Sequence, residues 1–335
     1  MRLLVTGATG FIGSHLAEAA VKAGHEVVGT GLADRPLERR IAQHLTAQGV
    51  TVIPASLVDS AAMERALDGV THVCHLGVAM REAGTDDRLF DTVNVQGTAE
   101  LLKSSARAGA KRFVFCSTTG IYGHRVAGVV NERSPLNPGN VYEASKVRAE
   151  AALRETAPQL GIEQVILRPS DVYGPRDARL LKLFSGVSRG RFPLFGDGSG
   201  RRHMVYIADV VEAFMLACTD PRAADVDVIL AGPDVTTLRA LLDLLVGLFG
   251  RRSFGPRLPL APMMTAAAVV EDMCTRLGIE PPIYRRRMDF YLSDAAYDVT
   301  QARSALGWVP RTTLRDGLQA TIAGYRQDGD LPASG

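Results

Sequence analysis

Residues 6–13 have the sequence TGATGFIG, and the segments on either side of this stretch decide the fold. The preceding run 2–5 (RLLV) is apolar and predicts a buried strand. The following segment 14–23 has apolar and small residues at helical spacing until Gly24, and it predicts a helix. A strand, a glycine turn and a helix in this order form a phosphate cradle. The sequence therefore predicts a dinucleotide site, with an ordinary strand-turn-helix as the alternative.

The glycines of this stretch are spaced three and three apart. Gly7 permits a tight turn, Gly10 lets the backbone approach a pyrophosphate, and Gly13 lets the helix pack closely on the strand. The helix N-terminus would then present free N–H groups and a positive dipole end to the phosphates. We expect the cofactor to be held by the residues of this turn, namely Gly7, Thr9, Gly10, Phe11, Ile12 and Gly13.

Length and composition restrict the class of protein. The chain has 335 residues, of which 46% are hydrophobic, and its formal net charge is only +2 with dispersed basic residues, so nucleic acid is not an expected partner. Four cysteines lie far apart and predict reduced thiols, with no disulfide frame and no metal site. The most apolar late stretch, 258–270, contains two prolines and is too short to span a bilayer. With a strand at the N-terminus and no signal peptide, a cytoplasmic protein is expected.

Further strands are predicted at 26–30, 50–54, 70–76, 112–116 and 164–167, with helices between them. This alternation predicts a doubly wound parallel sheet of the Rossmann-like α/β class, with its ligand crevice at the carboxyl ends of the strands. We expect a dinucleotide-binding domain at 1–168, to which 203–231 returns. A smaller α/β substrate-binding domain is expected from 169–202 and 232–335, partly interleaved with the first.

The end of the second strand normally selects between cofactors. An acid there binds a ribose 2′-hydroxyl, whereas a small residue with a nearby arginine makes room for a 2′-phosphate. This chain has Gly31 at that position, followed by Asp34 and Arg35. The pattern leaves NAD and NADP both open. His75, at the end of the fourth strand, is predicted to be a packed histidine.

Tyr142 and Lys146 are one helical turn apart. Asn140 is predicted to cap this helix, and Glu143 can reach back to its first turn. A neighbouring ammonium stabilises a phenolate and lowers the pKa of the phenol, so the pair makes a usable acid and base. An exposed tyrosine beside a solvated lysine is the alternative for the pair alone. The strand 112–116 ends in Ser117, Thr118 and Thr119, which places hydroxyl groups at the crevice.

These motifs together resemble the extended short-chain dehydrogenase/reductase family, which includes the nucleotide-sugar epimerases and dehydratases. Counterparts in the same order are VNVQGT (93–98), FCSTTGIYG (115–123), YEASK (142–146), LRPSDVYGP (167–175), GDGSGRR (196–202) and LGW (306–308). The resemblance implies that Thr118 hydrogen-bonds the reacting oxygen, Tyr142 exchanges a proton with it, and Lys146 holds the nicotinamide ribose, with Ser117 a near rival of Thr118. It also implies cofactor contacts from Ser56, Leu57, Leu76, Gly77, Asn94 and Pro169.

Departures from the family pattern narrow the reaction. Sugar 4,6-dehydratases carry an Asp-Glu pair directly after the threonine, where this chain has Thr119 and Gly120. Elimination is therefore disfavoured, and epimerisation by hydride transfer at a secondary alcohol carbon is the leading hypothesis. The alternatives are a reductase or dehydrogenase on another ring, such as a cyclitol, sterol or polyketide-like ketone, and a non-catalytic dinucleotide-binding sensor.

The substrate class depends on two residues. Arg202 matches the arginine that nucleotide-sugar enzymes use against the diphosphate, which indicates a nucleotide-sugar substrate with Thr118 and Thr119 also in contact. Asp171 stands where those enzymes present an asparagine amide, and we expect Arg168 or Arg176 to pair with it. Family members commonly pair through two helices, which 90–107 and 143–156 resemble, so a homodimer is expected.

Overall fold

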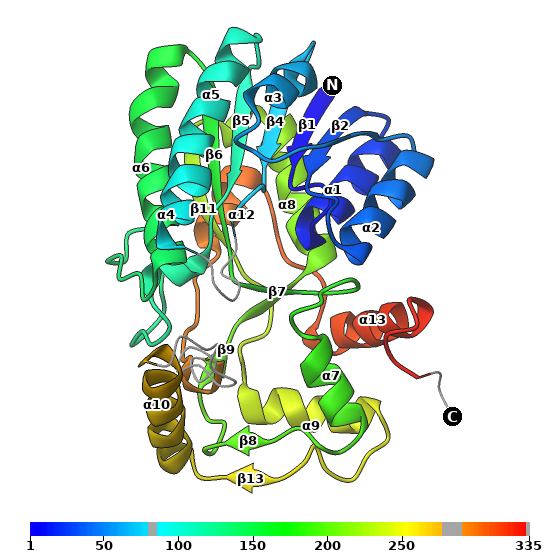
Figure 1. Cartoon of the computed structure of the whole chain (residues 1–335), viewed down its shortest axis with the longest axis vertical. Coiled ribbons are helices and arrows are strands. Elements are labelled where there is room, and N and C mark those ends of the chain that lie inside the picture. Colours follow the sequence, from blue (N-terminus) through cyan, green and yellow to red (C-terminus); the bar gives the residue numbers. More distant parts are fainter. Residues whose placement is uncertain (80–85, 277–289, 333–335) are drawn as a thin grey trace.

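The computed structural model describes residues 1–79, 86–276 and 290–332. Its largest element is a seven-stranded sheet in the order β11-β6-β5-β4-β1-β2-β3, and every neighbouring pair is parallel. The sheet confirms the predicted Rossmann-like doubly wound fold (Figure 1). Its strands are β1 (Arg2–Thr6), β2 (Glu26–Gly31), β3 (Thr51–Pro54), β4 (His72–His75), β5 (Arg112–Cys116), β6 (Glu163–Pro169) and β11 (Val226–Leu230).

Helices cover both faces of this sheet and bury two separate cores. One core packs against α1 (Phe11–Lys22), α2 (Pro36–Ala47), α8 (Ile207–Thr219) and α12 (Thr300–Leu306). The other packs against α3 (Ser60–Leu67), α5 (Gly97–Arg107) and α6 (Val141–Leu160). Successive residues of a strand point to opposite faces, so Leu3 and Val5 enter the first core while Leu4 enters the second. Burial on both faces explains why β1 is an uninterrupted apolar run.

One uniform helix is expected over 90–107. The structure differs from this expectation. The segment consists of α4 (Asp87–Phe90), a π-helical segment Asp91–Gln96, and α5. The side chain of Asn94 lies in the π-helical segment, where its Oδ1 accepts the N–H of Ala79 at 2.7 Å and its Nδ2 donates to Ser145 Oγ at 3.0 Å. A π-turn of this kind re-aims one side chain without ending the helix. Asn94 thereby ties the exit of β4 to α6.

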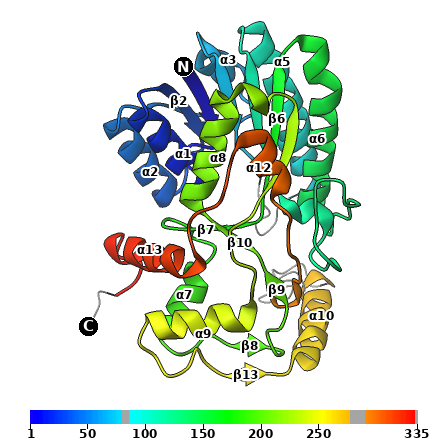
Figure 2. The same ribbon diagram turned by 180° about the vertical axis from the view of Figure 1, so that it is seen from behind.

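A smaller lobe lies beyond the carboxyl edge of the sheet (Figures 1 and 2). Its core is shared by α7 (Leu181–Ser188), α9 (Leu238–Leu248) and α13 (Leu314–Gln327). Thr237 caps α9, since its side chain accepts the N–H of Ala240 at 3.1 Å. Short strand pairs join this lobe to the sheet or lie within it: β7 (Asp171–Tyr173) with β10 (Met204–Tyr206), β9 (Arg201–Arg202) with β12 (Thr236–Thr237), and β8 (Leu194–Phe195) with β13 (Arg257–Leu258).

The last segments of the chain return to the large sheet. α12 packs beside β11, and the indole of Trp308 is buried in the core under α8, where its N–H donates to Asp209 O at 2.8 Å. The polypeptide passes between the two parts several times. The predicted domain boundaries remain a prediction. α10 (Leu260–Arg276) follows β13, and no helix among the described residues is long and apolar enough to cross a membrane. All four cysteines are free and buried.

Candidate active site

The glycine turn folds as a close-packed cradle. Gly10 N donates to Gly7 O at 2.9 Å, and α1 begins directly afterwards at Phe11. A Cβ added at Gly13 would lie 2.1 Å from Gly7 O, so only glycine allows α1 to start this close to β1. Gly10 has no side chain with which to cap the helix, and the N–H groups of the first turn remain available for an anion. The cradle therefore fits a dinucleotide pyrophosphate.

Gly31 ends β2 against the same cradle. A Cβ at this position would lie 2.4 Å from Thr9 Oγ1, so a side chain here would require Thr9 to move. Glu38 accepts the N–H groups of Asp34 and Arg35, both at 3.1 Å, and thereby caps α2. The carboxylate of Glu38 is therefore occupied by hydrogen bonds from these two backbone N–H groups. Asp34 and Arg35 are exposed and lie in the short loop between β2 and α2.

The exit of β4 is fixed next to the cradle by a buried histidine. His75 Nδ1 lies 2.7 Å from Thr6 Oγ1, and Nε2 lies 2.8 Å from Thr98 Oγ1. Burial, and then the charge of Lys146, lowers the pKa of His75 to about 3, so this side chain is a neutral packed histidine, as predicted. The N–H groups of Leu76 and Gly77 also donate to Thr6 Oγ1, at 3.1 and 2.9 Å.

The other predicted cofactor contacts lie along the same carboxyl edge of the sheet. Ser56 and Leu57 follow β3, and Pro169 is the last residue of β6. Leu57 also packs against Gly97, where an added Cβ would lie 3.1 Å from its side chain. The fold thus brings these positions to one edge, and their roles stay predictions.

Tyr142 and Lys146 lie on the first two turns of α6. Asn140 caps this helix as predicted, because its Oδ1 accepts the N–H of Glu143 at 3.0 Å. Lys146 is 3% exposed, donates to Cys116 O at 2.7 Å and lies 4.4 Å from the centroid of the Phe115 ring. The alternative of a solvated lysine is therefore wrong. Burial lowers the pKa of Lys146 to about 8, although Cys116 and Glu150 act in the opposite direction.

Thr118 opens a 3-10 turn, Thr119–Tyr122, directly after β5. Its Oγ1 accepts the N–H of Gly120 at 3.1 Å, which leaves the hydroxyl proton free to be donated. Thr118, Thr119, Asp171 and Arg202 line one pocket, so the predicted substrate contacts lie together. On the α6 side the pocket wall is formed by Glu143 rather than by Tyr142. Ser117 is buried and does not line the pocket, which favours Thr118 over its rival.

The predicted partner of Asp171 is wrong. Asp171 Oδ2 lies 3.5 Å from a terminal nitrogen of Arg202, while Arg168 and Arg176 bind other carboxylates. Arg202 is buried, its Cζ lies 4.7 Å from the centroid of the Phe290 ring, and its Nε and second terminal nitrogen have no hydrogen-bond partner in the described part of the chain. A buried guanidinium with unused donors is a strong site for a phosphate or carboxylate.

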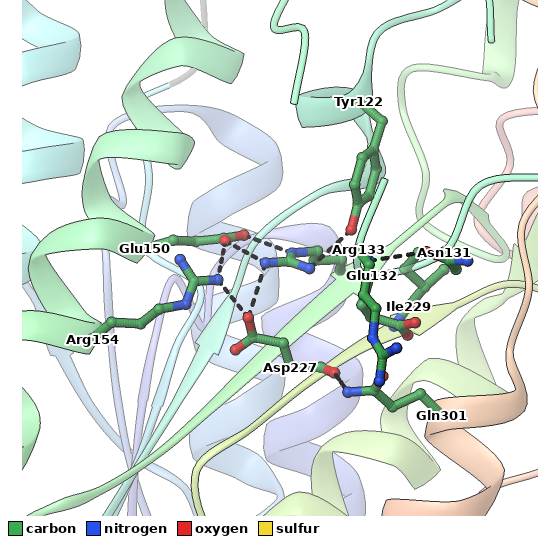
Figure 3. A network of polar contacts seen from close by, with 10 residues as sticks. Tyr122, Asn131, Glu132, Arg133, Glu150, Arg154, Asp227, Ile229 and Gln301 are labelled. Atoms are coloured by element: carbon green, nitrogen blue, oxygen red, sulfur yellow. Dashed lines mark hydrogen bonds and ion pairs between the residues drawn. The ribbon is translucent and has the colours of Figure 1, made fainter. Parts of the chain in front are cut away.

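Arg168 belongs to an ion network whose other members Tyr122, Glu150, Arg154 and Asp227 are labelled in Figure 3. It donates to the two oxygens of Glu150 at 3.0 and 2.6 Å, to the hydroxyl of Tyr122 at 2.9 Å, and to Asp227 at 3.0 Å. Arg154 bridges the same two carboxylates. Glu150 lies one turn beyond Lys146 on α6, so the network fixes this helix against β6 and β11.

Glu143 and His124 are pocket residues that are not among the predicted site residues. Glu143 was predicted only to support the start of α6, and its Oε2 does accept the N–H of Gly139 at 2.7 Å. Its Oε1 lies 2.9 Å from His124 Nε2, and both side chains line the pocket that contains Thr118. A Cβ at Gly120 would lie 3.0 Å from Glu143 Oε1, so the missing side chain at this position makes room for the carboxylate. The sequence signal that could have identified Glu143 is its position directly after Tyr142.

The cradle at the start of α1, the buried lysine one turn from Tyr142, and the threonine hydroxyl that follows β5 are the features of an NAD(P)-dependent enzyme of the short-chain dehydrogenase/reductase type. Comparison with known proteins agrees with this class. The chain belongs to the NAD dependent epimerase/dehydratase family, whose model matches residues 3–232.

Relatives within this group differ in the reactions for which they are named. The chain is 31% identical to a UDP-glucose 4-epimerase of Mycolicibacterium smegmatis, over 97% of this chain and 99% of the relative. It is 28% identical to a 2-alkyl-3-oxoalkanoate reductase of Stenotrophomonas maltophilia, over 95% and 98% of the two chains. Among solved structures, UDP-glucuronic acid 4-epimerase from Bacillus cereus in complex with NAD superposes with a TM-score of 0.80 at 25% identity, covering 98% and 99%.

Proposed function

We propose that this protein is an NAD-dependent epimerase that inverts a secondary alcohol carbon of a nucleotide sugar. The observation that carries the proposal is the pocket in which Thr118 and the buried guanidinium of Arg202 meet. A nucleotide sugar offers a hydroxyl for the first residue and a diphosphate for the second. The epimerases among the relatives and solved structures support this choice.

The side chains can divide the chemistry as follows. Thr118 donates its hydroxyl hydrogen to the reacting oxygen, and Tyr142 removes the proton from that oxygen and later returns it. The ammonium of Lys146 lies one turn away and stabilises the phenolate of Tyr142. Bound NAD supplies the hydride acceptor and donor. The chain holds the sugar ring so that either face can be presented to the cofactor.

The test uses the purified full-length protein with UDP-glucose. We expect proton NMR to show formation of the C4 epimer without a net change in the near-ultraviolet absorbance of reduced nicotinamide. Tyr142→Phe is expected to lower kcat by about 100-fold or more, because it removes the proton-transfer group. Net formation of reduced nicotinamide, or unchanged turnover by Tyr142→Phe, would contradict the proposal.

A second candidate is an NAD(P)H-dependent reductase on a ring or chain that carries no nucleotide. Asp171 favours it, because its carboxylate lies 3.5 Å from Arg202 and offsets part of the positive charge that would bind a diphosphate. The similarity to a 2-alkyl-3-oxoalkanoate reductase supports it as well. Consumption of NADPH or NADH with a ketone substrate, and no epimerisation of any UDP-sugar, would favour this candidate. The absence of turnover on ketones and nucleotide sugars alike would favour a dinucleotide-binding sensor.

We propose that the protein acts as a homodimer in the cytoplasm. The support for the dimer is the pair of long helices α5 and α6, which lie side by side on one face of the sheet (Figure 1). Their exposed sides include Lys103 and Ala151, so a second copy can pack against them.

A further inference from the structure

The loop that leaves β7 lies against the first turns of α1. Asp171, the first residue of β7, lines the substrate pocket, and α1 begins at Phe11 directly after the glycine turn. A Cβ added at Gly174 would lie 3.6 Å from Cζ of Phe11, and Cζ of Arg179 lies 5.8 Å from the centroid of the same ring. The loop is therefore where the cofactor cradle and the substrate pocket are joined by a short path through the chain.

Arg176 of this loop binds two side chains of α1. Its terminal nitrogens donate to the two carboxylate oxygens of Glu18 at 2.6 and 3.2 Å, and one of them also lies 2.8 Å from His15 Nδ1. A guanidinium can only donate, so His15 Nδ1 is an acceptor and its Nε2 carries the hydrogen, which is donated to Pro175 O at 3.0 Å. Only 16% of the Arg176 side chain and 14% of the Glu18 side chain are exposed. These hydrogen bonds fix the loop to the helix.

The protonation states near neutral pH suit these contacts. Burial acts to raise the pKa of Glu18, but the hydrogen bonds and the charge of Arg176 outweigh it, so the pKa lies below its usual value. Burial, and then the charge of Arg176, lowers the pKa of His15 to about 4. The arginine keeps its proton throughout. The contact therefore consists of an ionised carboxylate, a neutral imidazole and a charged guanidinium.

The backbone of Arg176 is strained. Its φ is 68°, in the left-handed region, and among the described residues Asp225 is the only other non-glycine residue with a positive φ. Aspartate tolerates this region better than a long side chain does, and glycine adopts it without strain. A conformation of this kind persists only where surrounding contacts maintain it. Here those contacts are made by the arginine side chain with α1.

We propose that Arg176 is a positioning residue that holds the cofactor-binding helix α1 at a fixed position relative to the substrate pocket. It follows Asp171 by five positions, and its partners His15 and Glu18 are the fifth and eighth residues of α1. Hydride transfer needs close approach of the reacting atoms, so a small shift of α1 against β7 slows the reaction while substrate contacts remain. The inference rests on the proposed function for this hydride transfer. Arg176 acts through α1 and is assigned no contact with the substrate.

Two substitutions at position 176 separate positioning from stability. Arg176→Ala and Arg176→Gly both remove the side-chain contacts, but glycine also relieves the left-handed backbone, so its urea midpoint should be the higher of the two. Both variants should nevertheless lose kcat on UDP-glucose by the same factor, about tenfold or more, while KM changes by less than about twofold. Arg222→Ala is the matched control, because Arg222 lies 2.6 Å from Asp220 in an ion pair outside the two pockets. It should keep the wild-type kcat.

Amide hydrogen exchange of the full-length protein gives a measurement that does not depend on turnover. The peptide that covers residues 11–18 should exchange about threefold faster or more in both Arg176 variants than in the wild type and in Arg222→Ala. A kcat that recovers in Arg176→Gly together with its stability would show a purely structural role and overturn the proposal, and so would unchanged exchange in this peptide. A wild-type protein that does not epimerise UDP-glucose would overturn the proposed function, whereas the exchange rates would still decide whether Arg176 holds α1.

Discussion

At the scale of single residues, the site depends on a lysine that is charged in a place with little water. The Lys146 ammonium is held by one carbonyl, that of Cys116, and by the face of the Phe115 ring. Burial favours the neutral amine, and the pKa of Lys146 is lowered to about 8. The charge that stabilises a phenolate is therefore present below pH 8 and is lost as the pH rises through this value.

The pH dependence of turnover should follow this charge. We expect kcat/KM of the wild type to fall above about pH 8, because the deprotonated amine no longer stabilises the Tyr142 phenolate. In Lys146→Met the charge is absent at every pH, so the variant should be about 100-fold slower than the wild type at pH 6.5 but only a few-fold slower above pH 9.5. Rates measured across this range check the prediction. A constant ratio between the two enzymes would show that the ammonium does not act through its charge.

Sequence reasoning succeeded at this scale where the partners are close in the chain. The spacing of Tyr142 and Lys146 follows from helical periodicity alone, and so does the Asn140 cap. The partner of Asp171 could not be obtained in this way. β7 and β10 pair with Met204 opposite Asp171, and this register brings Arg202 beside the carboxylate from 31 residues away. The residues close to Asp171 in the sequence do not predict the register of this strand pair.

At the scale of elements, α6 is fixed to the sheet by the ion network of Glu150, Arg168 and Asp227, of which Glu150 and Asp227 are labelled in Figure 3. Two of these side chains, Glu150 and Arg168, are 0% and 3% exposed. Their charges attract strongly, but most of this gain offsets the cost of removing them from water. Losing one partner is therefore worse than losing both, since the other charge remains buried and unpaired.

Glu150→Gln should accordingly destabilise the fold by about 3 kcal/mol, near the lower end of the usual cost of breaking a buried ion pair, because Arg168 loses its two-oxygen partner and keeps only its contact with Asp227. Arg154→Gln is the matched comparison, because Arg154 contacts the same carboxylates but its side chain is 39% exposed, and it should cost about 1 kcal/mol or less. Urea unfolding monitored by circular dichroism measures both free energies of unfolding. Equal costs for the two variants would contradict the buried-charge explanation.

The π-helical segment shows the limit of periodicity at this scale. Apolar spacing correctly predicts helix over most of 90–107, but the π-turn at Asn94 is set by contacts with Ala79 and Ser145, which come from other elements. Local sequence reasoning has the same limit for Glu143 in the site. Its sequence position explains its hydrogen bond near the start of α6, whereas its place in the pocket depends on the loop that carries Gly120 and His124.

At the scale of the whole molecule, the strand and helix order was sufficient to predict the parallel sheet, because right-handed crossovers leave few alternatives. The order of strands and helices could not show that the C-terminal segments pack back against the large sheet. Gln301 donates to Asp227 O at 2.8 Å, and Trp308 donates to Asp209 O. These contacts join residues more than 70 positions apart. They depend on the surface that β11 and α8 present in the folded protein rather than on any local sequence pattern.

The proposed homodimer gives a prediction at the same scale. Light scattering coupled to size-exclusion chromatography should give a mass near twice 35.9 kDa. Ala151 is exposed on α6, and Ala151→Arg should shift the mass toward that of one chain, because a long charged side chain separates two packed helices. Lys22→Ala, on α1 at the other face of the sheet, serves as the control and should leave the mass unchanged. A wild-type mass of 35.9 kDa would refute the dimer.

The contact between Gly31 and Thr9 restricts how the cofactor preference of this enzyme can evolve or be engineered. In many dinucleotide folds, one substitution at the end of the second strand exchanges NAD for NADP. Here a Cβ at position 31 would lie 2.4 Å from Thr9 Oγ1 and 3.2 Å from Thr9 N, so such a substitution requires the Thr9 side chain of the phosphate cradle to move. A library that aims to switch the cofactor should therefore keep Gly31, or vary it together with Thr9, and should vary the exposed residues Asp34 and Arg35.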